Sequence, residues 1–475
     1  MNRTNIIDTT KNISQEVLLK GWVHFYRDKG KIIFIELRDV TGIVQCVVWP
    51  ARSATHSVAG GHEDKKAFET AKKISVEDVV EIIGKVNQRP KSQVKKGLAT
   101  GNVEVVVKQV KLINKAKTPP FEISKDKFKD EVKEELRLKY RYLDLRRPKM
   151  RDKIILRHRV IKFIRDFLDQ KGFYEIETPI LTKSTPEGAR DYLVPSRLYP
   201  GKAYALPQSP QQYKQLLMVA GFERYFQIAR CFRDEDPRSD RQPEFTQLDI
   251  EMSFCQQEDI LNLAEELFTQ LVEQVTDCHL TFKPFERLTY KEAMDKYGTD
   301  SPDLRKDKND PKELAFVWIL DWPLFEWNRD ESRWDPHHHI FTAPQEKDIP
   351  LLDKDPAKVK SWQHDLACNG YEVGGGSIRI HNPEIQKKVL KLVGISEEEA
   401  EEKFGHLLEA FSYGAPPHGG IAPGLDRILM LLAGESNIRE VITFPKTTDA
   451  KDLMMDAPSE VDKGQWEDLH LQLKK

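Results

Sequence analysis

The sequence predicts an α+β chain of at least two domains, with a small β-barrel first and a larger antiparallel β-sheet with flanking helices after it. Its 475 residues exceed what a single hydrophobic core supports. Residues 1–115 contain only short strand-like segments, whereas segments with helical periodicity begin near residue 151. Residues 1–118 carry 21 lysines and arginines against 12 aspartates and glutamates, and the remainder carries 53 against 64. This basic first section favours a nucleic-acid-binding module, although a solvated surface gives a charge excess of this size as often.

The first domain, residues 1–115, is predicted from five short strands separated by glycine-containing turns. The strands are expected at Val17–Phe25, Lys31–Arg38, Ile43–Trp49, Val79–Val86 and Val103–Leu112. Five short strands in so few residues favour a small closed barrel. The OB-fold, which binds single-stranded nucleic acid on one face, is the first candidate, and SH3-like and other small barrels remain alternatives.

Residues 116–148 change in character and predict a hinge. They contain Pro119-Pro120, a run rich in lysine and acidic residues, and a basic stretch over 136–147 that favours a short helix. The second domain, residues 149–475, opens with a helix over 155–168. Strands are expected at 173–178, 203–206, 224–231, 246–253, 317–321, 371–381 and 419–422, with helices at 257–276, 384–394 and 424–434. This order indicates an antiparallel sheet and not a βαβ series.

The composition excludes several classes of protein. Hydrophobic residues make up 39% and charged residues 32%, mean hydropathy is -0.57, and no apolar run is long enough to cross a bilayer. The five cysteines are odd in number and include no C-x-x-C pair, which argues against a disulfide framework or a zinc site. No secretory or transit signal is visible in the first residues, so we expect a cytoplasmic protein with no membrane partner.

Two segments carry arginines in settings that suit phosphate. Arg233 and Glu235 leave a predicted strand together, and would place a guanidinium fork and a carboxylate at a cleft mouth. A salt-bridged hairpin tip is an equally good interpretation of that pattern alone. Gly424 opens an apolar helix that carries Arg427 in its first turn, where an anion is favoured. A capped core helix with a surface arginine is the simpler alternative.

A glycine-rich strand and a pair of acids complete the candidates. Gly374 to Gly376 precede Arg379, and glycines inside a strand mark the close approach of a ligand or of another backbone. Asp365 and Glu372 could converge on Mg²⁺, which takes one or two carboxylates with substrate phosphates. Three consecutive histidines, 337–339, cannot all face one ion in an extended strand, so no metal site is predicted there.

Taken together, these segments resemble the class II aminoacyl-tRNA synthetases, and in detail the bacterial-type aspartyl-tRNA synthetases. The resemblance covers nearly the whole chain in order: barrel, hinge and the three class motifs. Residues 172–179 match motif 1, residues 233–235 with 241–247 match motif 2, and residues 424–427 match motif 3. In this family motif 1 builds the dimer interface, which here would lie around Pro179. The resemblance implies an OB-fold anticodon-binding domain and a class II antiparallel catalytic sheet.

The resemblance implies an enzyme that activates L-aspartate with ATP to aspartyl-adenylate and transfers aspartate to the 3′ end of tRNA(Asp). If its specificity is relaxed, tRNA(Asn) would be a second substrate, whereas DNA is not expected as a partner. Lys214 and Arg379 would grip the side-chain carboxylate, and charge logic agrees, because two cations suit a dicarboxylate. The full aspartate set implied by the family is Glu187, Ser209, Gln211, Lys214, Arg233, Asp249, His338 and Arg379.

The family implies a nucleotide site, a Mg²⁺ site and an anticodon site. Its catalytic groups would be Arg233, Arg427 and Glu235, acting by position and charge, with no protein nucleophile. Asp365 and Glu372 would hold Mg²⁺. The implied ATP contacts are Arg233, Asp234, Glu235, Gln242, Glu372, Gly424, Leu425, Asp426 and Arg427, and the implied anticodon contacts are Arg27, Phe34, Gln45 and Glu104. Phe34 would be a stacking platform for a base, and a core position is its alternative.

The chain departs from the family pattern in a few places. A short link over residues 305–314 stands where bacterial members carry a large insertion domain, and Pro423 and Ile340 replace the usual residues. Lys29 stands where strict members often have leucine and relaxed ones histidine, so it does not settle the tRNA range. Two alternatives stay open: a sibling asparaginyl or lysyl synthetase, against which Lys214 with Arg379 argues, and a non-catalytic tRNA-binding paralogue.

Overall fold

The computed structural model describes residues 1–50, 62–124, 132–185 and 188–472. Contacts divide the chain into two compact units. The first comprises residues 1–133 with 142–148, and the second comprises 134–141 with 149–475.

The smaller unit is a closed five-stranded barrel, as predicted. Its strands pair in the order β1-β2-β3-β5-β4, and the bounds are β1 (Glu16–Asp28), β2 (Ile33–Asp39), β3 (Gly42–Val48), β4 (Val79–Gln88) and β5 (Val103–Asn114). Alternate side chains such as Ile33, Ile35 and Leu37 fill the interior. Helix α1 (His62–Ala71), which the sequence pattern did not predict, packs against β3 and β5.

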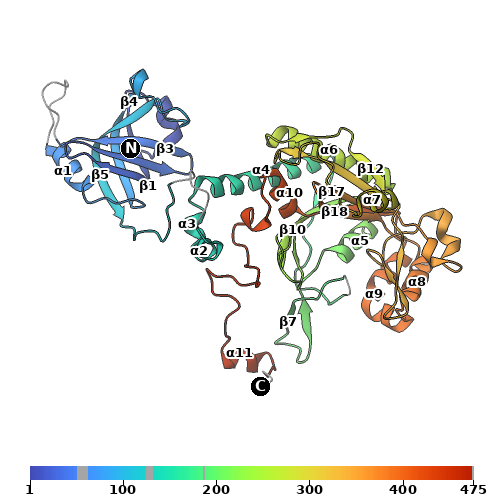
Figure 1. The fold of residues 1–475 in the computed structure, drawn as a ribbon. Coiled ribbons are helices and arrows are strands. Elements are labelled where there is room, and N and C mark those ends of the chain that lie inside the picture. The colour runs from blue at the N-terminus through green and yellow to red at the C-terminus, as the bar shows by residue number, and fades with distance from the viewer. Residues whose placement is uncertain (51–61, 125–131, 186–187, 473–475) are drawn as a thin grey trace. The chain divides into compact units, whose positions relative to one another are not determined.

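The larger unit is built on an eight-stranded sheet in the order β12-β14-β17-β18-β19-β10-β9-β6 (Figure 1). From β14 to β9 every pairing is antiparallel, as predicted, whereas the edge pairs β12–β14 and β6–β9 are parallel. The bounds are β12 (Glu286–Thr289), β14 (Phe316–Leu320), β17 (Gln363–Cys368), β18 (Tyr371–Ile378), β19 (His418–Pro423), β10 (Glu244–Ser253), β9 (Arg224–Phe232) and β6 (Tyr174–Glu175). Strand β17 lies near the centre of the sheet although the sequence pattern did not identify it.

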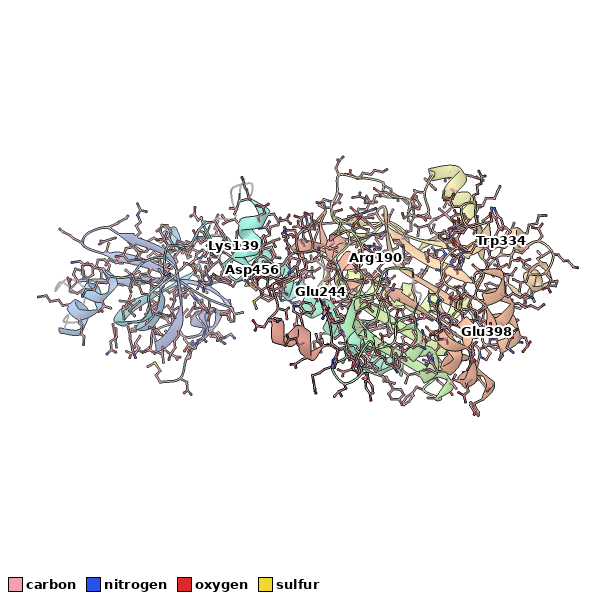
Figure 2. All side chains as sticks on the ribbon, turned by 90° about the horizontal axis from the view of Figure 1, so that it is seen from below. Lys139, Arg190, Glu244, Trp334, Glu398 and Asp456 are labelled. Carbon is pink, nitrogen blue, oxygen red and sulfur yellow. The ribbon has the colours of Figure 1, made fainter. Side chains whose placement is uncertain are left out.

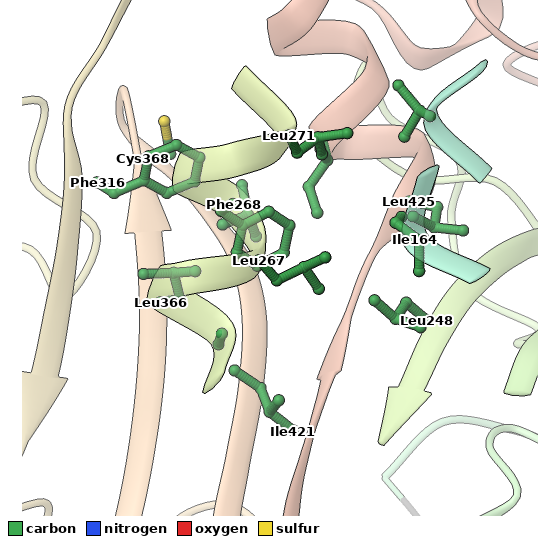
Figure 3. Packing of buried hydrophobic residues seen from close by; sticks show 14 of the residues in the cluster. Ile164, Leu248, Leu267, Phe268, Leu271, Phe316, Leu366, Cys368, Ile421 and Leu425 are labelled. Atoms are coloured by element: carbon green, nitrogen blue, oxygen red, sulfur yellow. The ribbon is translucent and has the colours of Figure 1, made fainter. Parts of the chain in front are cut away.

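Three helices cover one face of this sheet, and the other face carries polar residues together with a small apolar cluster that includes Val317, Ile319 and Ala367. The helices are α4 (Pro148–Gln170), α6 (Gln257–Val275) and α10 (Leu425–Leu432). Figure 3 shows Ile164, Leu267 and Leu425 from these helices packed with Leu248 and Leu366 from the strands. Because side chains alternate along a strand, the neighbours of Leu248 and Leu366 point to the opposite face.

A second hydrophobic cluster joins α8 (Pro383–Leu392) and α9 (Glu397–Ser412), and Trp334, labelled in Figure 2, packs against it. The remaining helices and strands are α2 (Glu134–Lys139), α3 (Arg141–Asp144), α5 (Gln211–Val219), α7 (Tyr290–Tyr297), α11 (Lys463–Asp468), β7 (Leu193–Pro195), β8 (Ala203–Ala205), β11 (His279–Leu280), β13 (Glu313–Leu314), β15 (Phe325–Asn328) and β16 (Arg333–Pro336). The 3-10 helices are η1 (Ile6–Lys11), η2 (Lys91–Gln93), η3 (Glu346–Leu351), η4 (Pro356–Lys358) and η5 (Ile438–Glu440).

The short link over 305–314 forms a compact turn. The Glu313 carboxylate accepts hydrogen bonds from the backbone N–H groups of Lys306 (3.0 Å) and Asp307 (2.8 Å). Asp303 also pairs with Arg305 at 2.8 Å. Carboxylates of the link itself and of its flanks therefore satisfy several of its backbone donors, two of them through Glu313.

The composition argues against a membrane-spanning helix and against a disulfide framework. Among the described residues, no helix combines the length and apolarity that crossing a membrane requires. No disulfide joins any two of the five cysteines, all of which lie in the described part of the chain.

Candidate active site

A cavity of about 380 Å³ lies on the polar face of the larger sheet. Its walls come from the β9–β10 hairpin, strands β17 and β18, the start of α10, and the segment that opens α5. Gln247 and Asp249 of β10 line it, while Leu248 between them lies in the core on the other face. The same alternation places Glu251 on the polar face, so β10 supplies a row of polar groups.

The predicted cation pair meets at one end of the cavity. Lys214 Nζ donates to Asp249 Oδ1 (2.7 Å) and lies 3.2 Å from Glu251 Oε2. Arg379 donates from Nε and Nη2 to the two Glu251 oxygens (3.0 and 3.2 Å), and from Nη1 to Ser377 Oγ (2.7 Å). All four charged groups are buried. Since Lys214 has three N–H donors and Arg379 has five, each keeps donors for a ligand carboxylate.

Asp249 keeps an acceptor for a ligand cation. Its Oδ2 is buried and has no hydrogen-bond partner in the described part of the chain. The nearby Tyr225 hydroxyl donates to Gln227 Oε1 at 2.9 Å. Burial raises the pKa of Asp249, against the opposing effect of Lys214. A buried carboxylate oxygen of this kind fits an ammonium group.

Residues just before and at the start of α5 form the wall of this end of the cavity. Ser209 and Gln211 line the cavity, as the family resemblance implies. Gln208 binds the neighbouring stretch, because its amide pairs with both backbone groups of Ala189 (3.0 and 2.8 Å) and donates to Asp191 Oδ1 (2.6 Å). Glu187, predicted to face the ammonium group, lies outside the described residues.

The opposite end carries the motif 2 and motif 3 arginines. Arg233 lines the cavity with its guanidinium 5.0 Å from the centre of the Phe245 ring, and its buried Nε has no partner in the described residues. Arg427 pairs with Asp240 (3.1 Å) and donates to the Glu372 carbonyl (2.7 Å). Two guanidinium groups facing one cavity suit a polyphosphate.

Other predicted nucleotide residues fall into two groups. Glu235, paired with Arg241 at 2.9 Å, lines the cavity, as do Gln242, Gly424 and Asp426. The Gln242 amide is bound on both sides to the backbone of Lys446. In contrast, Leu425 lies in the hydrophobic core, and Asp234 faces Arg190 at 3.7 Å outside the cavity lining. Asp426 accepts from the Thr246 backbone N–H (2.8 Å) and so ties motif 3 to motif 2.

The two predicted metal ligands meet above Gly375. A Cβ atom on Gly375 would lie 2.9 Å from Asp365 Oδ1 and 3.5 Å from Glu372 Oε1, so the two carboxylates share the space a side chain would fill. Desolvation by the surrounding protein and the negative charge of Asp365 raise the pKa of the Glu372 carboxyl. Within the described residues no third acid, histidine or cysteine completes a metal-binding group with them, although His338 lies 3.0 Å from Asp365 Oδ2. Two acids beside a polyphosphate cavity fit Mg²⁺, which completes its shell with phosphate and water.

The three histidines have different surroundings, although the rings of His337 and His338 stack with their centroids 5.0 Å apart. His338 lines the cavity and contacts Asp365 Oδ2 at 3.0 Å. Burial by itself lowers the pKa of His338, but the charge and hydrogen bond of Asp365, together with the Glu372 charge, outweigh burial and raise that pKa. His337 packs against Trp322, and burial lowers the pKa of His339 to about 3.

The predicted anticodon residues share the outer face of the barrel. Arg27 of β1 lies opposite Phe34 of β2 in the strand register. Gln45 of β3 donates a hydrogen bond to Glu104 of β5 at 3.2 Å. Lys29 lies 5.8 Å from the centre of the Phe34 ring. Phe34 is partly exposed among buried neighbours, so it is not a core residue.

The sequence pattern does not identify several residues in or beside the cavity. Glu251, which contacts Lys214 and Arg379 behind the lining, follows Asp249 by two positions and therefore shares its face. Gln363 donates to Asp365 (2.7 Å), and Asp240 pairs with Arg427. No sequence signal marks Asp240, because its partner comes from a distant segment, whereas Gln363 lies two positions before Asp365 on β17 and so shares its face.

Residues 133–448 match the family described as tRNA synthetases class II (D, K and N), and residues 17–113 match the OB-fold nucleic acid binding domain. The OB-fold prediction is thereby confirmed. The Aspartate--tRNA(Asp/Asn) ligase of Dehalococcoides mccartyi is 43% identical over 98% of both chains, and that of Rubrobacter xylanophilus is 44% identical over 97% of this chain and 95% of its own. The Aspartate--tRNA ligase of Bacillus licheniformis is 43% identical over 98% of both.

The alignment with the Dehalococcoides protein spans 599 positions against a chain of 475 residues, so well over a hundred positions have no counterpart here. Solved structures share the fold. Asparaginyl-tRNA synthetase from Pyrococcus horikoshii has a TM-score of 0.73 at 24% identity, covering 94% of this chain and 98% of its own. Aspartyl tRNA synthetase from Entamoeba histolytica has a TM-score of 0.72 at 24% identity, covering 94% and 91%.

Proposed function

Since the chain belongs to the class II tRNA synthetases (D, K and N) and its full-length relatives are aspartate--tRNA ligases, we propose that its cavity joins L-aspartate to ATP and then to tRNA. The chain is an aspartate-specific aminoacyl-tRNA ligase. The observation that carries the proposed site is the buried cluster of Lys214, Arg379, Asp249 and Glu251. Its cations keep donors for the side-chain carboxylate, and Asp249 keeps an acceptor for the α-ammonium group.

The nucleotide occupies the other end of the same cavity. Arg233 and Arg427 bind its phosphates, and Glu235 with Arg241 flanks the adenosine. The aspartate α-carboxylate attacks the α-phosphorus in line, a P–O bond forms, and pyrophosphate leaves with the electron pair of the broken bond. The 3′-terminal ribose hydroxyl of tRNA then attacks the activated carbonyl and AMP leaves. Both steps need positioning and charge neutralisation more than a protein nucleophile.

Mg²⁺ is the cation that Asp365 and Glu372 would hold. The glycine at 375 leaves room for both carboxylates, and the Arg427 bond to the Glu372 carbonyl keeps the phosphate site beside them. The ion would neutralise phosphate charge and orient the polyphosphate.

The barrel is proposed to bind the anticodon on the face that carries Arg27, Phe34, Gln45 and Glu104. Phe34 offers a partly exposed ring for stacking, and the polar residues offer hydrogen bonds to base edges. A Phe34→Ala variant should raise the KM for tRNA about tenfold and leave aspartate-dependent pyrophosphate exchange unchanged. An equal loss in both assays would contradict this assignment.

A homodimer formed through motif 1 is proposed for the edge at β6. Tyr174, Ile180 and Leu181 are large apolar side chains exposed around Pro179. Such a strip favours burial against a second copy. Light scattering should give about twice 55.0 kDa, and a monomeric mass would overturn the proposal. The cytoplasmic location stays a prediction.

The proposed function is tested by charging tRNA(Asp) and tRNA(Asn) transcripts separately with radiolabelled aspartate. Charging of tRNA(Asp) alone would indicate a strict enzyme, and charging of both a relaxed one, as named for two of the relatives. Charging of neither, with transcripts that a control enzyme accepts, would overturn the proposal in favour of a tRNA-binding paralogue.

A further inference from the structure

Three buried side chains form a hydrogen-bonded line beside the aspartate end of the cavity, which is the end that holds Lys214 and Arg379. Gln211 and Gln215 lie one turn apart on α5, and His418 opens β19. Gln211 Nε2 lies 3.1 Å from Gln215 Oε1, and Gln215 Nε2 lies 3.1 Å from His418 Nε2. His418 Nδ1 lies 2.8 Å from the Pro416 carbonyl oxygen. Only Gln211 of the three is among the described residues that line the cavity.

The direction of every hydrogen bond in this line is fixed from the Pro416 end. A carbonyl oxygen can only accept, so His418 Nδ1 carries the proton. Burial lowers the pKa of His418; Arg379 and His381 also lower it, while Glu251 raises it, and the net shift is downward. The ring is therefore neutral at neutral pH, and its Nε2 is an acceptor.

The neutral ring then decides the orientation of both amides. Gln215 must turn its NH₂ group to His418, which leaves its oxygen for Gln211. Gln211 must in turn give its NH₂ group to Gln215. Its own oxygen, Oε1, has no hydrogen-bond partner in the described residues, so it is the amide atom left for a ligand. An amide turned the other way would offer a donor, which an ammonium group cannot use.

We propose that His418 and Gln215 are positioning residues that hold the Gln211 amide with its carbonyl oxygen toward the α-ammonium group of the amino acid. This inference rests on the proposed function, because it takes aspartate to be the ligand. Gln211 Oε1 and the unpartnered Asp249 Oδ2 would then be two acceptors for that ammonium group.

The first test is Gln215→Met, which keeps the length of the side chain and removes both hydrogen bonds. In aspartate-dependent pyrophosphate exchange, the KM for aspartate should rise about tenfold, with kcat and the KM for ATP within about twofold of wild type. Succinate, which has both carboxylates of aspartate and no ammonium group, is the matched probe. Its Ki as a competitor should stay unchanged, because it does not use the ammonium acceptors.

The second test compares two substitutions at position 418. His418→Leu removes the acceptor and should raise the KM for aspartate as Gln215→Met does. His418→Gln can place a carbonyl oxygen near the former Nε2 and should restore a KM within about threefold of wild type. A loss of packing alone would give both variants the same defect.

Different outcomes separate the two proposals. If the wild-type chain catalyses no aspartate-dependent exchange, the proposed function fails. If wild-type exchange is normal and Gln215→Met leaves the KM for aspartate unchanged, or raises the succinate Ki equally, the positioning role is overturned and the proposed function stands.

Discussion

The cavity has an aspartate end, with Lys214 and Arg379, and a nucleotide end, with Arg233 and Arg427. The two ends differ in how deeply their charged groups are buried. At the aspartate end, the side chains of Lys214 and Arg379 are 2% and 5% exposed and are bound by two carboxylates that are fully buried. At the nucleotide end, Arg427 is 24% exposed and Arg241 44%. Buried charges are costly unless paired, so the cations of the aspartate end are already paired before substrate arrives, while Asp249 Oδ2 stays unpartnered. The nucleotide end can rely on the charge of its ligand.

This difference indicates where selectivity resides. A preformed network rejects a ligand that leaves a buried group unpaired, whereas an open cationic site accepts any polyphosphate of the right size. Substitutions at the aspartate end should therefore impair the use of aspartate, and substitutions at the nucleotide end should impair the use of ATP.

The largest effect is expected from Arg379→Leu. It removes a carboxylate donor and leaves Glu251 with one cation fewer, so kcat/KM for aspartate should fall at least about 1,000-fold. ATP binding, measured by calorimetry, should stay within about twofold of wild type. Unchanged aspartate activation would break the assignment of the aspartate end.

The next effect concerns acid stability. Burial alone would raise the pKa of Glu251, but Arg379 and Lys214 outweigh it and lower the pKa to about 2. A carboxyl group with a lowered pKa stabilises the fold above pH 5 and loses this contribution as pH falls toward 2, here about 3 kcal/mol. Urea unfolding between pH 5 and 2 should show this loss in the wild-type chain and less of it in Glu251→Gln.

Glu440 provides the matched control for Glu251. Its pKa is also lowered to about 2, because Arg137 and Lys153 outweigh its burial, but it is paired with neither Lys214 nor Arg379. Glu440→Gln should reduce the acid dependence similarly and keep the KM for aspartate, whereas Glu251→Gln should raise that KM. If both variants raised the KM for aspartate equally, the effect of Glu251→Gln would reflect the stability of the fold and not the pairing of Glu251 with Lys214 and Arg379.

A smaller effect is expected from Arg427→Lys. The substitution keeps the charge and loses the guanidinium fork, so the KM for ATP should rise about 20-fold. The KM for aspartate at saturating ATP should change little. A larger change for aspartate than for ATP would contradict the division of the cavity into two ends.

The smallest effect is expected from Gly375→Ala. The new Cβ would displace the Asp365 carboxylate, which Gln363 holds, and should raise the Mg²⁺ concentration for half-maximal exchange about tenfold. An unchanged Mg²⁺ requirement would argue against Asp365 and Glu372 as the metal pair.

The sequence by itself determined the barrel, the antiparallel order of the inner strands and the helices α4, α6, α8 and α10. These depend on local alternation and periodicity, which short windows contain. It did not reveal helices α1, α5, α7 and α9. It also missed the central strand β17, whose residues are buried on both faces and so show no alternation. Motif spacing named most residues of the cavity, but did not separate Leu425, a core residue, from Arg427 two positions later.

Only the tertiary structure decided how the charges are paired. Lys214 comes from α5, Glu251 from β10 and Arg379 from beyond β18, so their network exists only once the sheet is formed. The same holds for Gln215 and His418, which are 203 positions apart in the chain. The physical reason is that a buried charge or amide takes its partner from whatever segment the fold brings within hydrogen-bond distance, and sequence separation carries no record of that distance.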